Sequence, residues 1–110
     1  MRAFKYELDL DKLGIKEETG KPINHKITFE RFLEVGLASL YPQGLDNRTR
    51  RTYGRVLDKL DLSTDGVINL EEVEHELVSE VFVSDKTKFD VKQTRVVGLY
   101  AKAVEEAKKL

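Results

Sequence analysis

Residues 47–83 read NRTRRTYGRVLDKLDLSTDGVINLEEVEHELVSEVFV, and they predict the main supersecondary unit of the chain. Apolar residues recur every three or four positions in both of its flanks, which predicts amphipathic helices over 47–60 and 70–83. The apolar stripes are Tyr53, Val56, Leu57 and Leu60 in the first helix and Leu70, Val73, Leu77 and Val81 in the second. The segment that joins them, 61–72, is rich in Asp, Ser, Thr and Gly, which favour turns. The stretch therefore predicts a helix-loop-helix, with Asp46 as a suitable N-cap for its first helix.

Oxygen-bearing side chains alternate along the joining segment, DLSTDGVINLEE at 61–72. A hard cation such as calcium requires oxygen ligands at alternating positions of a tightly turned loop. These twelve residues, with a helix on each side, resemble the EF-hand calcium loop. The resemblance implies calcium ligands at Asp61, Ser63, Asp65, the Val67 carbonyl, Asn69 and Glu72. It also implies a positive φ at Gly66 and a short β-piece at Ile68 that pairs with a second loop.

The same segment is also suited to a purely structural turn between two helices. Asn69 and Glu72 have the N-x-x-E spacing of a capping box, in which the Glu72 carboxylate folds back to the Asn69 N–H. Ser63 stands where an EF-hand loop usually has Asp or Asn, and Leu62 is apolar. The chain contains no second ligand loop. A calcium loop and a capped turn are therefore both kept as hypotheses, and they compete for the Glu72 side chain.

Basic residues cluster on the first helix of the pair, at Arg48, Arg51, Arg55 and Lys59. Such a patch is suited to phosphates or to an acidic protein partner. The second helix is acidic, so pairing between the two helices is the alternative explanation of both clusters. We favour this intramolecular pairing, because most runs of charge are solvated or locally paired.

The rest of the chain adds one β element and two helices. Residues 3–10 alternate, with Phe4, Tyr6, Leu8 and Leu10 on one side, which predicts a half-buried strand. A strand or hairpin over 3–28 is expected, and in a hairpin Ile23 and Ile27 would pair back on this strand. Further helices are expected over 28–41, with Thr28 as N-cap, and over 90–109. The fold class is α+β, mostly α, in one domain spanning 1–110. The expected core is Phe32, Leu33, Leu37, Leu57, Leu60, Val73, Leu77, Val97 and Val104.

Composition and short motifs argue against several classes of function for this chain. The chain has 110 residues, a net charge of -1 and no cysteine, so it offers neither thiolate metal ligands nor a cysteine nucleophile. It has no glycine-rich phosphate loop and no serine–histidine motif, so we expect no enzymatic activity. The acidic net charge argues against nucleic acid as a partner. No apolar run is long enough for a membrane span and no signal-peptide pattern is present, so a cytoplasmic location is expected.

The order of the predicted elements offers a second, looser resemblance. A strand with a GKPI-type sequence, a short helix and then an acidic helix after a turn is similar to the layout of small tailed-bacteriophage accessory proteins. That resemblance implies a metal-free interaction protein within a larger assembly. Our first functional hypothesis is a small binding module whose helix-loop-helix binds calcium and contacts a protein partner. The phage-type protein is the alternative, weak nucleic-acid binding through the arginine helix comes third, and self-association is also considered.

Overall fold

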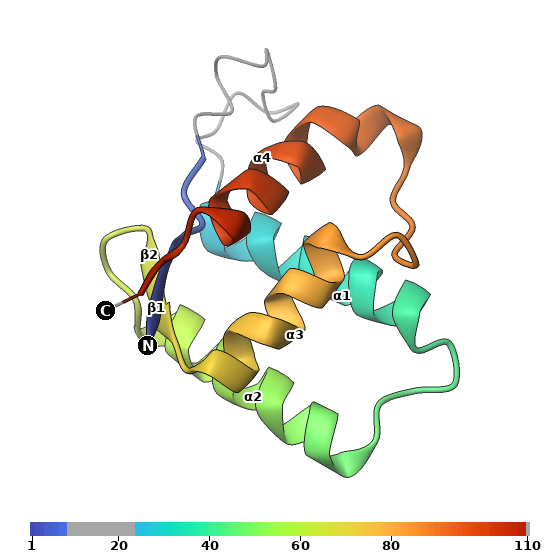
Figure 1. Cartoon of the computed structure of the whole chain (residues 1–110), viewed down its shortest axis with the longest axis horizontal. Coiled ribbons are helices and arrows are strands. Elements are labelled where there is room, and N and C mark those ends of the chain that lie inside the picture. Colours follow the sequence, from blue (N-terminus) through green and yellow to red (C-terminus); the bar gives the residue numbers. More distant parts are fainter. Residues whose placement is uncertain (9–23, 110) are drawn as a thin grey trace.

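The computed structural model describes residues 1–8 and 24–109, with no side-chain placement at 108 and 109. Within these residues the chain is mostly helical, which confirms the α+β, mostly α class. The helices are α1 (His25–Leu40), α2 (Asn47–Leu62), α3 (Glu72–Val83), a short 3-10 helix η2 (Val91–Gln93) and α4 (Thr94–Glu105). The strands are β1 (Arg2–Lys5), β2 (Val67–Leu70) and β3 (Lys108–Lys109). Figure 1 shows the sheet at one side of the molecule, with α3 running from the sheet across the face that is in view.

The three strands form one antiparallel sheet in the order β2-β1-β3. Phe4 of β1 lies opposite Ile68 of β2, and Arg2 lies opposite both Leu70 and Lys109. Phe4, Ile68 and Leu70 are buried because alternate strand residues face the helices. The N-terminal strand is thus confirmed over residues 3–5 of the predicted 3–10, and it lies at the centre of the sheet. Residues 6–8 are not part of the strand, and residues 9 and 10 fall outside the described residues. The predicted pairing of Ile27 with this strand is wrong.

The predicted pairing failed because both strand partners of β1 come from later in the chain. Ile27, the proposed partner residue, lies in α1 and is 47% exposed. Ile23 and Leu10 fall outside the described residues. Strand β2 instead comes from the loop segment, where Ile68 had been expected in a β-piece. That β-piece is confirmed, but it pairs with β1 and not with a second loop.

The helix boundaries differ from the predictions for local reasons. Helix α1 begins before Thr28, because the Asn24 side chain caps it by accepting from the Ile27 N–H at 3.2 Å. Helix α3 begins at Glu72 and not at residue 70, because Leu70 belongs to β2. The predicted 90–109 helix is divided into η2 and α4, and its last residues form β3.

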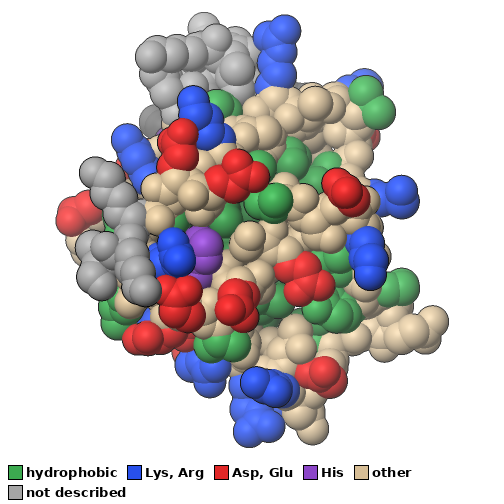
Figure 2. All heavy atoms as spheres, viewed as in Figure 1, with side chains coloured by type: hydrophobic (Ala, Val, Ile, Leu, Met, Phe, Trp, Pro, Cys, Tyr) green, Lys and Arg blue, Asp and Glu red, His purple; other side chains and the backbone are tan. Residues whose placement is uncertain are grey.

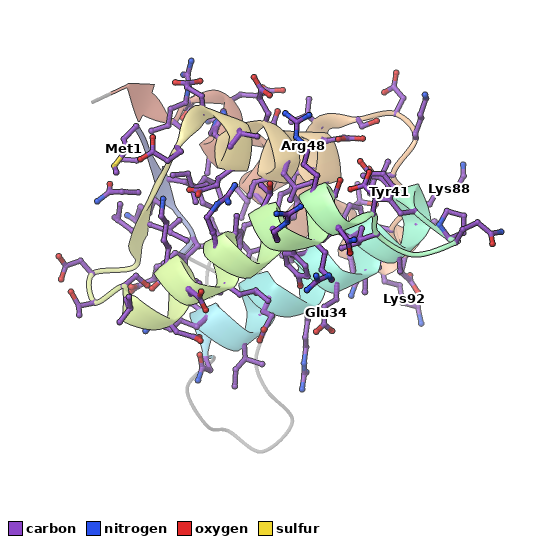
Figure 3. The ribbon with its side chains drawn as sticks, turned by 90° about the horizontal axis from the view of Figure 1, so that it is seen from below. Met1, Glu34, Tyr41, Arg48, Lys88 and Lys92 are labelled. Atoms are coloured by element: carbon purple, nitrogen blue, oxygen red, sulfur yellow. The ribbon has the colours of Figure 1, made fainter. Side chains whose placement is uncertain are left out.

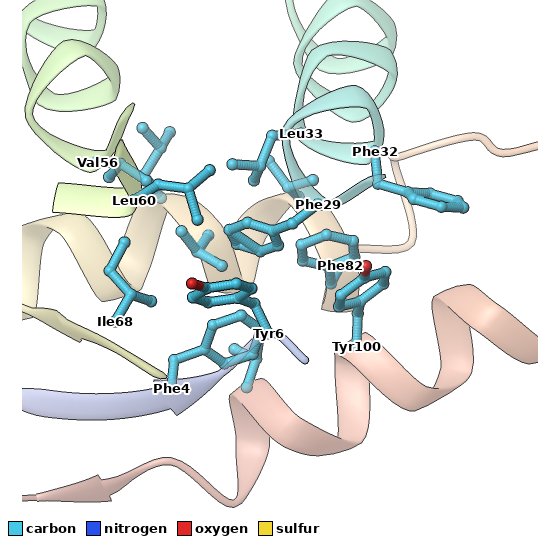
Figure 4. Close-up of a cluster of buried hydrophobic side chains, with 14 of the residues drawn as sticks. Phe4, Tyr6, Phe29, Phe32, Leu33, Val56, Leu60, Ile68, Phe82 and Tyr100 are labelled. Carbon is cyan, nitrogen blue, oxygen red and sulfur yellow. The ribbon is translucent and has the colours of Figure 1, made fainter. Parts of the chain in front are cut away.

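Aromatic rings contributed by α1, α3 and α4 form the centre of the core (Figure 4). The ring centroids of Phe82 and Tyr100 are 5.1 Å apart, and those of Phe29 and Tyr100 are 5.6 Å apart. Tyr100 is fully buried, and its hydroxyl has no hydrogen-bond partner among the described residues. Burial raises the pKa of this phenol well above its ordinary value. The core therefore holds a polar atom whose lost contact with water is not replaced by any described protein group.

Most of the predicted core is buried, but three residues are not. Val73 is 41% exposed, and Leu57 and Val97 are only partly buried. On α3 the buried arc is centred on Val78 and Val81, so Val73 falls at its edge. The apolar periodicity of α3 was correctly assigned to a helix, but its buried face was placed about one residue out of position.

Helices α1 and α3 cross closely at Gly36. A Cβ at this position would overlap Cγ1 of Val81 and lie 3.2 Å from the Phe89 ring. Gly36 therefore allows the two backbones to approach each other. This contact positions the C-terminal half of α1 beside the exposed part of α3.

Candidate functional site

The backbone of segment 61–72 follows the predicted helix-loop-helix. Helix α2 ends at Leu62, a turn leads into β2, and α3 begins at Glu72. Gly66 has φ +71°, and a Cβ there would overlap the side chain of Glu7. Its carbonyl accepts the backbone N–H groups of Tyr6 at 3.0 Å and Glu7 at 3.2 Å. The positive φ expected at the sixth loop position is therefore present, and the close approach of β1 also requires glycine there.

Three of the predicted ligand side chains, those of Ser63, Asp65 and Glu72, have partners within the protein. Ser63 Oγ donates to the Leu60 carbonyl at 2.6 Å and also hydrogen-bonds the Tyr6 hydroxyl. The Asp65 carboxylate accepts from the Thr64 hydroxyl at 3.3 Å. Asp61 lies in the last turn of α2, whereas Val67 and Asn69 lie in β2. Across residues 1–8 and 24–109, no three His, Asp or Glu side chains form a group that could hold a metal ion. In this conformation the Asp61, Asp65 and Glu72 carboxylates are therefore not gathered into such a group.

Cations from elsewhere in the chain reach both ends of the segment. Arg2 Nε lies 3.2 Å from each Glu72 carboxylate oxygen. Lys26 Nζ donates to the Asp61 carbonyl at 3.1 Å. Positive charge therefore already reaches the first and twelfth loop positions. Sequence reasoning missed Arg2 and Lys26 because both lie more than thirty positions from the loop residues that they contact.

The cap of α3 is not the predicted one. Asn69 lies in β2 opposite Ala3, so it does not form a capping box with Glu72, and that hypothesis is wrong. Glu71 is the N-cap instead, and it forms a capping box with Glu74, whose carboxylate accepts the Glu71 N–H at 2.9 Å. The cap and the start of α3 are both displaced by two residues.

Glu74 also links α3 to α2. Its carboxylate accepts Lys59 Nζ at 2.5 Å and Arg55 Nε at 3.3 Å, and the side chain is only 1% exposed. Burial raises the pKa of this carboxyl, but hydrogen bonds from Lys59, the Glu71 backbone and Arg55 outweigh burial and hold the pKa below its ordinary value. The predicted pairing between the two helices is confirmed for Arg55 and Lys59. The sequence did contain a signal for this role, because Glu74 is a charged residue that lies between the apolar positions of α3.

The other two residues of the basic patch lie in the N-terminal half of α2. Arg51 Nε donates to the Asn47 carbonyl at 3.1 Å, within its own helix. Arg48 lies on the same side of the molecule as Tyr41 (Figure 3). The four-residue patch is therefore divided. Arg55 and Lys59 pair with Glu74, whereas Arg48 and Arg51 lie nearer the N-terminal end of α2.

A cleft of about 320 Å³ lies between α2, α3 and the end of α1. Val73 and Leu77 of α3 supply apolar surface, and Thr52 of α2 is a buried residue in its lining. Charged and polar groups complete the lining, namely Tyr41, Asp46, Arg48, Thr49, Glu76 and Glu80. These residues come from three separate segments, so no spacing pattern in the sequence could reveal the cleft.

Two polar contacts hold the rim of this cleft in place. The Tyr41 hydroxyl donates to the Glu80 carboxylate at 3.2 Å, and burial and that carboxylate together raise the pKa of Tyr41. Asp46 caps α2 by accepting the Thr49 N–H at 2.7 Å, as predicted. Hydrogen bonds from the backbone and side chain of Thr49 lower the pKa of Asp46. The rim is therefore ordered and carries more negative than positive charge.

One exposed face of α3 borders the cleft, and we call Val73, Glu76, Glu80 and Val83 the α3 stripe. Val73 and Val83 are 41% and 40% exposed, and the two glutamates lie between them. A second hollow of about 370 Å³ lies on the far side of the glutamates, beside His75 and Ser79. Figure 2 shows acidic side chains along the course that α3 takes in Figure 1. The α3 stripe is thus an acidic ridge with an apolar residue at each end.

No helix in the described part of the chain is long and apolar enough to cross a membrane. Comparison with protein-family models, curated protein sequences and solved structures gave no match for this chain.

Proposed function

We propose that this chain is a small, non-enzymatic binding module that contacts a protein partner through the helix-loop-helix formed by α2, β2 and α3. The α3 stripe is the observation that carries the proposal. Val73 and Val83 leave apolar surface on the same face as Glu76 and Glu80, and a hollow borders the two glutamates on each side. Apolar contact area with a charged rim is the usual composition of a protein interface.

Affinity capture with the full chain tests this proposal. The double variant Val73→Ser/Val83→Ser removes the apolar ends of the stripe but leaves the buried arc of α3 intact. Val91→Ser is the matched control, because Val91 is 86% exposed and lies on η2. We expect a captured protein that the wild type and the control retain, and that the double variant retains about fivefold less. Capture that is unchanged in the double variant, or equally reduced in the Val91 control, would overturn the proposal.

Calcium binding by the 61–72 segment is the second candidate function. The positive φ of Gly66 and the short strand at Ile68 favour it, since both are features of the resembled loop. An ion-binding conformation would require Ser63 and Glu72 to exchange their present partners, so we expect modest affinity. Thermal denaturation in millimolar calcium and in EGTA tests this candidate.

Calcium binding should raise the melting temperature progressively once its concentration exceeds the dissociation constant. Glu72→Gln should abolish that rise, whereas Arg2→Gln should increase it because Arg2 pairs with Glu72. A melting temperature that does not respond to millimolar calcium in the unsubstituted protein would end this candidate.

The remaining expectations concern context. A role as a metal-free accessory protein in a larger assembly of bacteriophage type is compatible with binding through the α3 stripe. Weak nucleic-acid binding through α2 is a less favoured candidate than these, because Arg55 and Lys59 are already paired with Glu74. We place the protein in the cytoplasm as part of the same proposal.

A further inference from the structure

We infer that the cleft between α2 and α3 is the docking site for a protein segment that carries lysine or arginine side chains. This inference rests on the proposed function, and it names the chemistry of the partner that the α3 stripe contacts. Three features support it: the lining of the cleft, its charge, and the spacing of Glu76 and Glu80.

The lining suits a side chain that is apolar along its stem and charged at its end. Val73 and Leu77 line the cleft beside the two glutamates, and Leu77 is only 8% exposed. Lysine and arginine lay their methylene stems on apolar surface and keep the cationic group at a polar rim. A volume of about 320 Å³ accommodates side chains of this size.

The charges of the cleft complement a basic segment. Asp46, Glu76 and Glu80 contribute three carboxylates to the lining, and Arg48 contributes one guanidinium. Because Arg48 lies beside Asp46 at the start of α2, the net negative charge of the lining is on the α3 wall, and an incoming cation is attracted there. Complementary charge of this kind orients a partner and increases its association rate.

The two α3 glutamates also have a spacing that an extended segment can match. Residues four positions apart rise about 6 Å along a helix axis. Alternate residues of an extended chain lie about 6.6 Å apart on the same face. Two cationic residues separated by one apolar residue therefore reach Glu76 and Glu80 together, and a helical segment does so with cations four positions apart.

The test uses two N-acetylated, C-amidated pentapeptides, Ala-Lys-Leu-Lys-Ala and its counterpart Ala-Glu-Leu-Glu-Ala. Each is titrated into the ¹⁵N-labelled full chain, and amide chemical shifts are followed. We expect the lysine peptide to shift residues 46–52 and 73–80, with an affinity that falls as salt rises. The glutamate peptide should leave these amides unchanged.

Variants show whether the two carboxylates are responsible. Glu76→Gln/Glu80→Gln should weaken lysine-peptide binding by about fivefold or more, because it removes two exposed ion pairs. The amide oxygen that replaces the Glu80 carboxylate still accepts from the Tyr41 hydroxyl, so the rim of the cleft is kept. Glu105→Gln is the matched control, because Glu105 is an exposed glutamate on α4 outside the cleft, and its variant should bind as the wild type does.

Three results of the peptide titrations would overturn the inference: no lysine-peptide shifts at the cleft, equal shifts from both peptides, or undiminished binding by the double glutamine variant. Cleft shifts that grow with protein concentration in the absence of peptide would assign the cleft to a second copy of the chain, and would also overturn it. A capture experiment that finds no partner dependent on Val73 and Val83 defeats the proposed function itself. A partner that depends on the stripe valines but ignores both glutamates defeats only this inference.

Discussion

Replacement of Glu74 by glutamine tests whether this buried carboxylate joins α2 to α3. The substitution keeps the side-chain shape and an oxygen that accepts the Glu71 N–H, but it removes the negative charge that faces Lys59 and Arg55. Lys59 and the Glu71 N–H share one carboxylate oxygen and Arg55 uses the other, so the glutamine keeps its oxygen for the first two and presents an NH2 group to Arg55. The hydrogen bond to Arg55 is therefore lost, and a hydrogen bond between charged groups contributes about 1.5–3 kcal/mol.

We expect a loss of about 2 kcal/mol in the free energy of unfolding at pH 7. The exposed fractions of Arg55 and Lys59 are 53% and 30%, so water replaces part of the lost interaction and keeps the loss from exceeding this value. Urea denaturation measures the loss. Glu105→Gln, an exposed change on α4, is the control and should stay within about 0.5 kcal/mol of the wild type.

The pH dependence of the loss has a definite sign. The folded-state pKa of Glu74 lies below its ordinary value, so its carboxylate stabilises the fold above the unfolded-state pKa. That contribution disappears as pH falls through the lowered folded-state pKa. The difference between wild type and Glu74→Gln should therefore shrink toward zero in acid. A loss under about 0.5 kcal/mol at pH 7, or a loss that stays the same size as pH falls through the folded-state pKa of Glu74, would contradict this role of the carboxylate.

Three further substitutions test the packing of the core and the helices. Gly36→Ala should cost about 1–3 kcal/mol, because its methyl group overlaps Val81, and calorimetry showing no destabilisation would contradict the close helix crossing. Gly98→Ala should stabilise by up to about 1 kcal/mol, since its methyl group meets open space on α4; a lower melting temperature would argue against that register. Tyr100→Phe should stabilise by about 1 kcal/mol in urea denaturation by removing the unpartnered hydroxyl, and destabilisation would show that this hydroxyl has a partner.

Helices and the first strand were predictable because their signals are local. Periods of about 3.6 and 2 in apolar residues follow directly from helix and strand geometry. Strand pairing is not local, because Phe4 and Ile68 are brought together by the whole of the intervening chain. Lys108 and Lys109 suit the C-terminal end of a helix, which is what the sequence predicts. They form a strand instead because β1 lies beside them and pairs with them.

The candidate site was predictable only where its residues lie on one segment. The turn at Gly66 and the β-piece at Ile68 follow from the spacing within 61–72. The directions of the polar side chains do not, because Tyr6, Arg2 and Lys26 determine the partners of Ser63, Glu72 and the Asp61 carbonyl. The exposure of Val73 depended on where α3 begins, which β2 determines.

The central position of β1 has a consequence for the kinetics of folding. Its pairings join Arg2 to Leu70 and to Lys109, so each closes a long loop before any strand contact forms. Closure of a long loop costs more conformational entropy than the local contacts within a helix pair. We therefore expect α2 and α3 to associate early and the sheet to form late, because β1 can pair only after β2 and β3 have come close to it. A fold this rich in helix should then reach its native state more slowly than its helical content alone suggests.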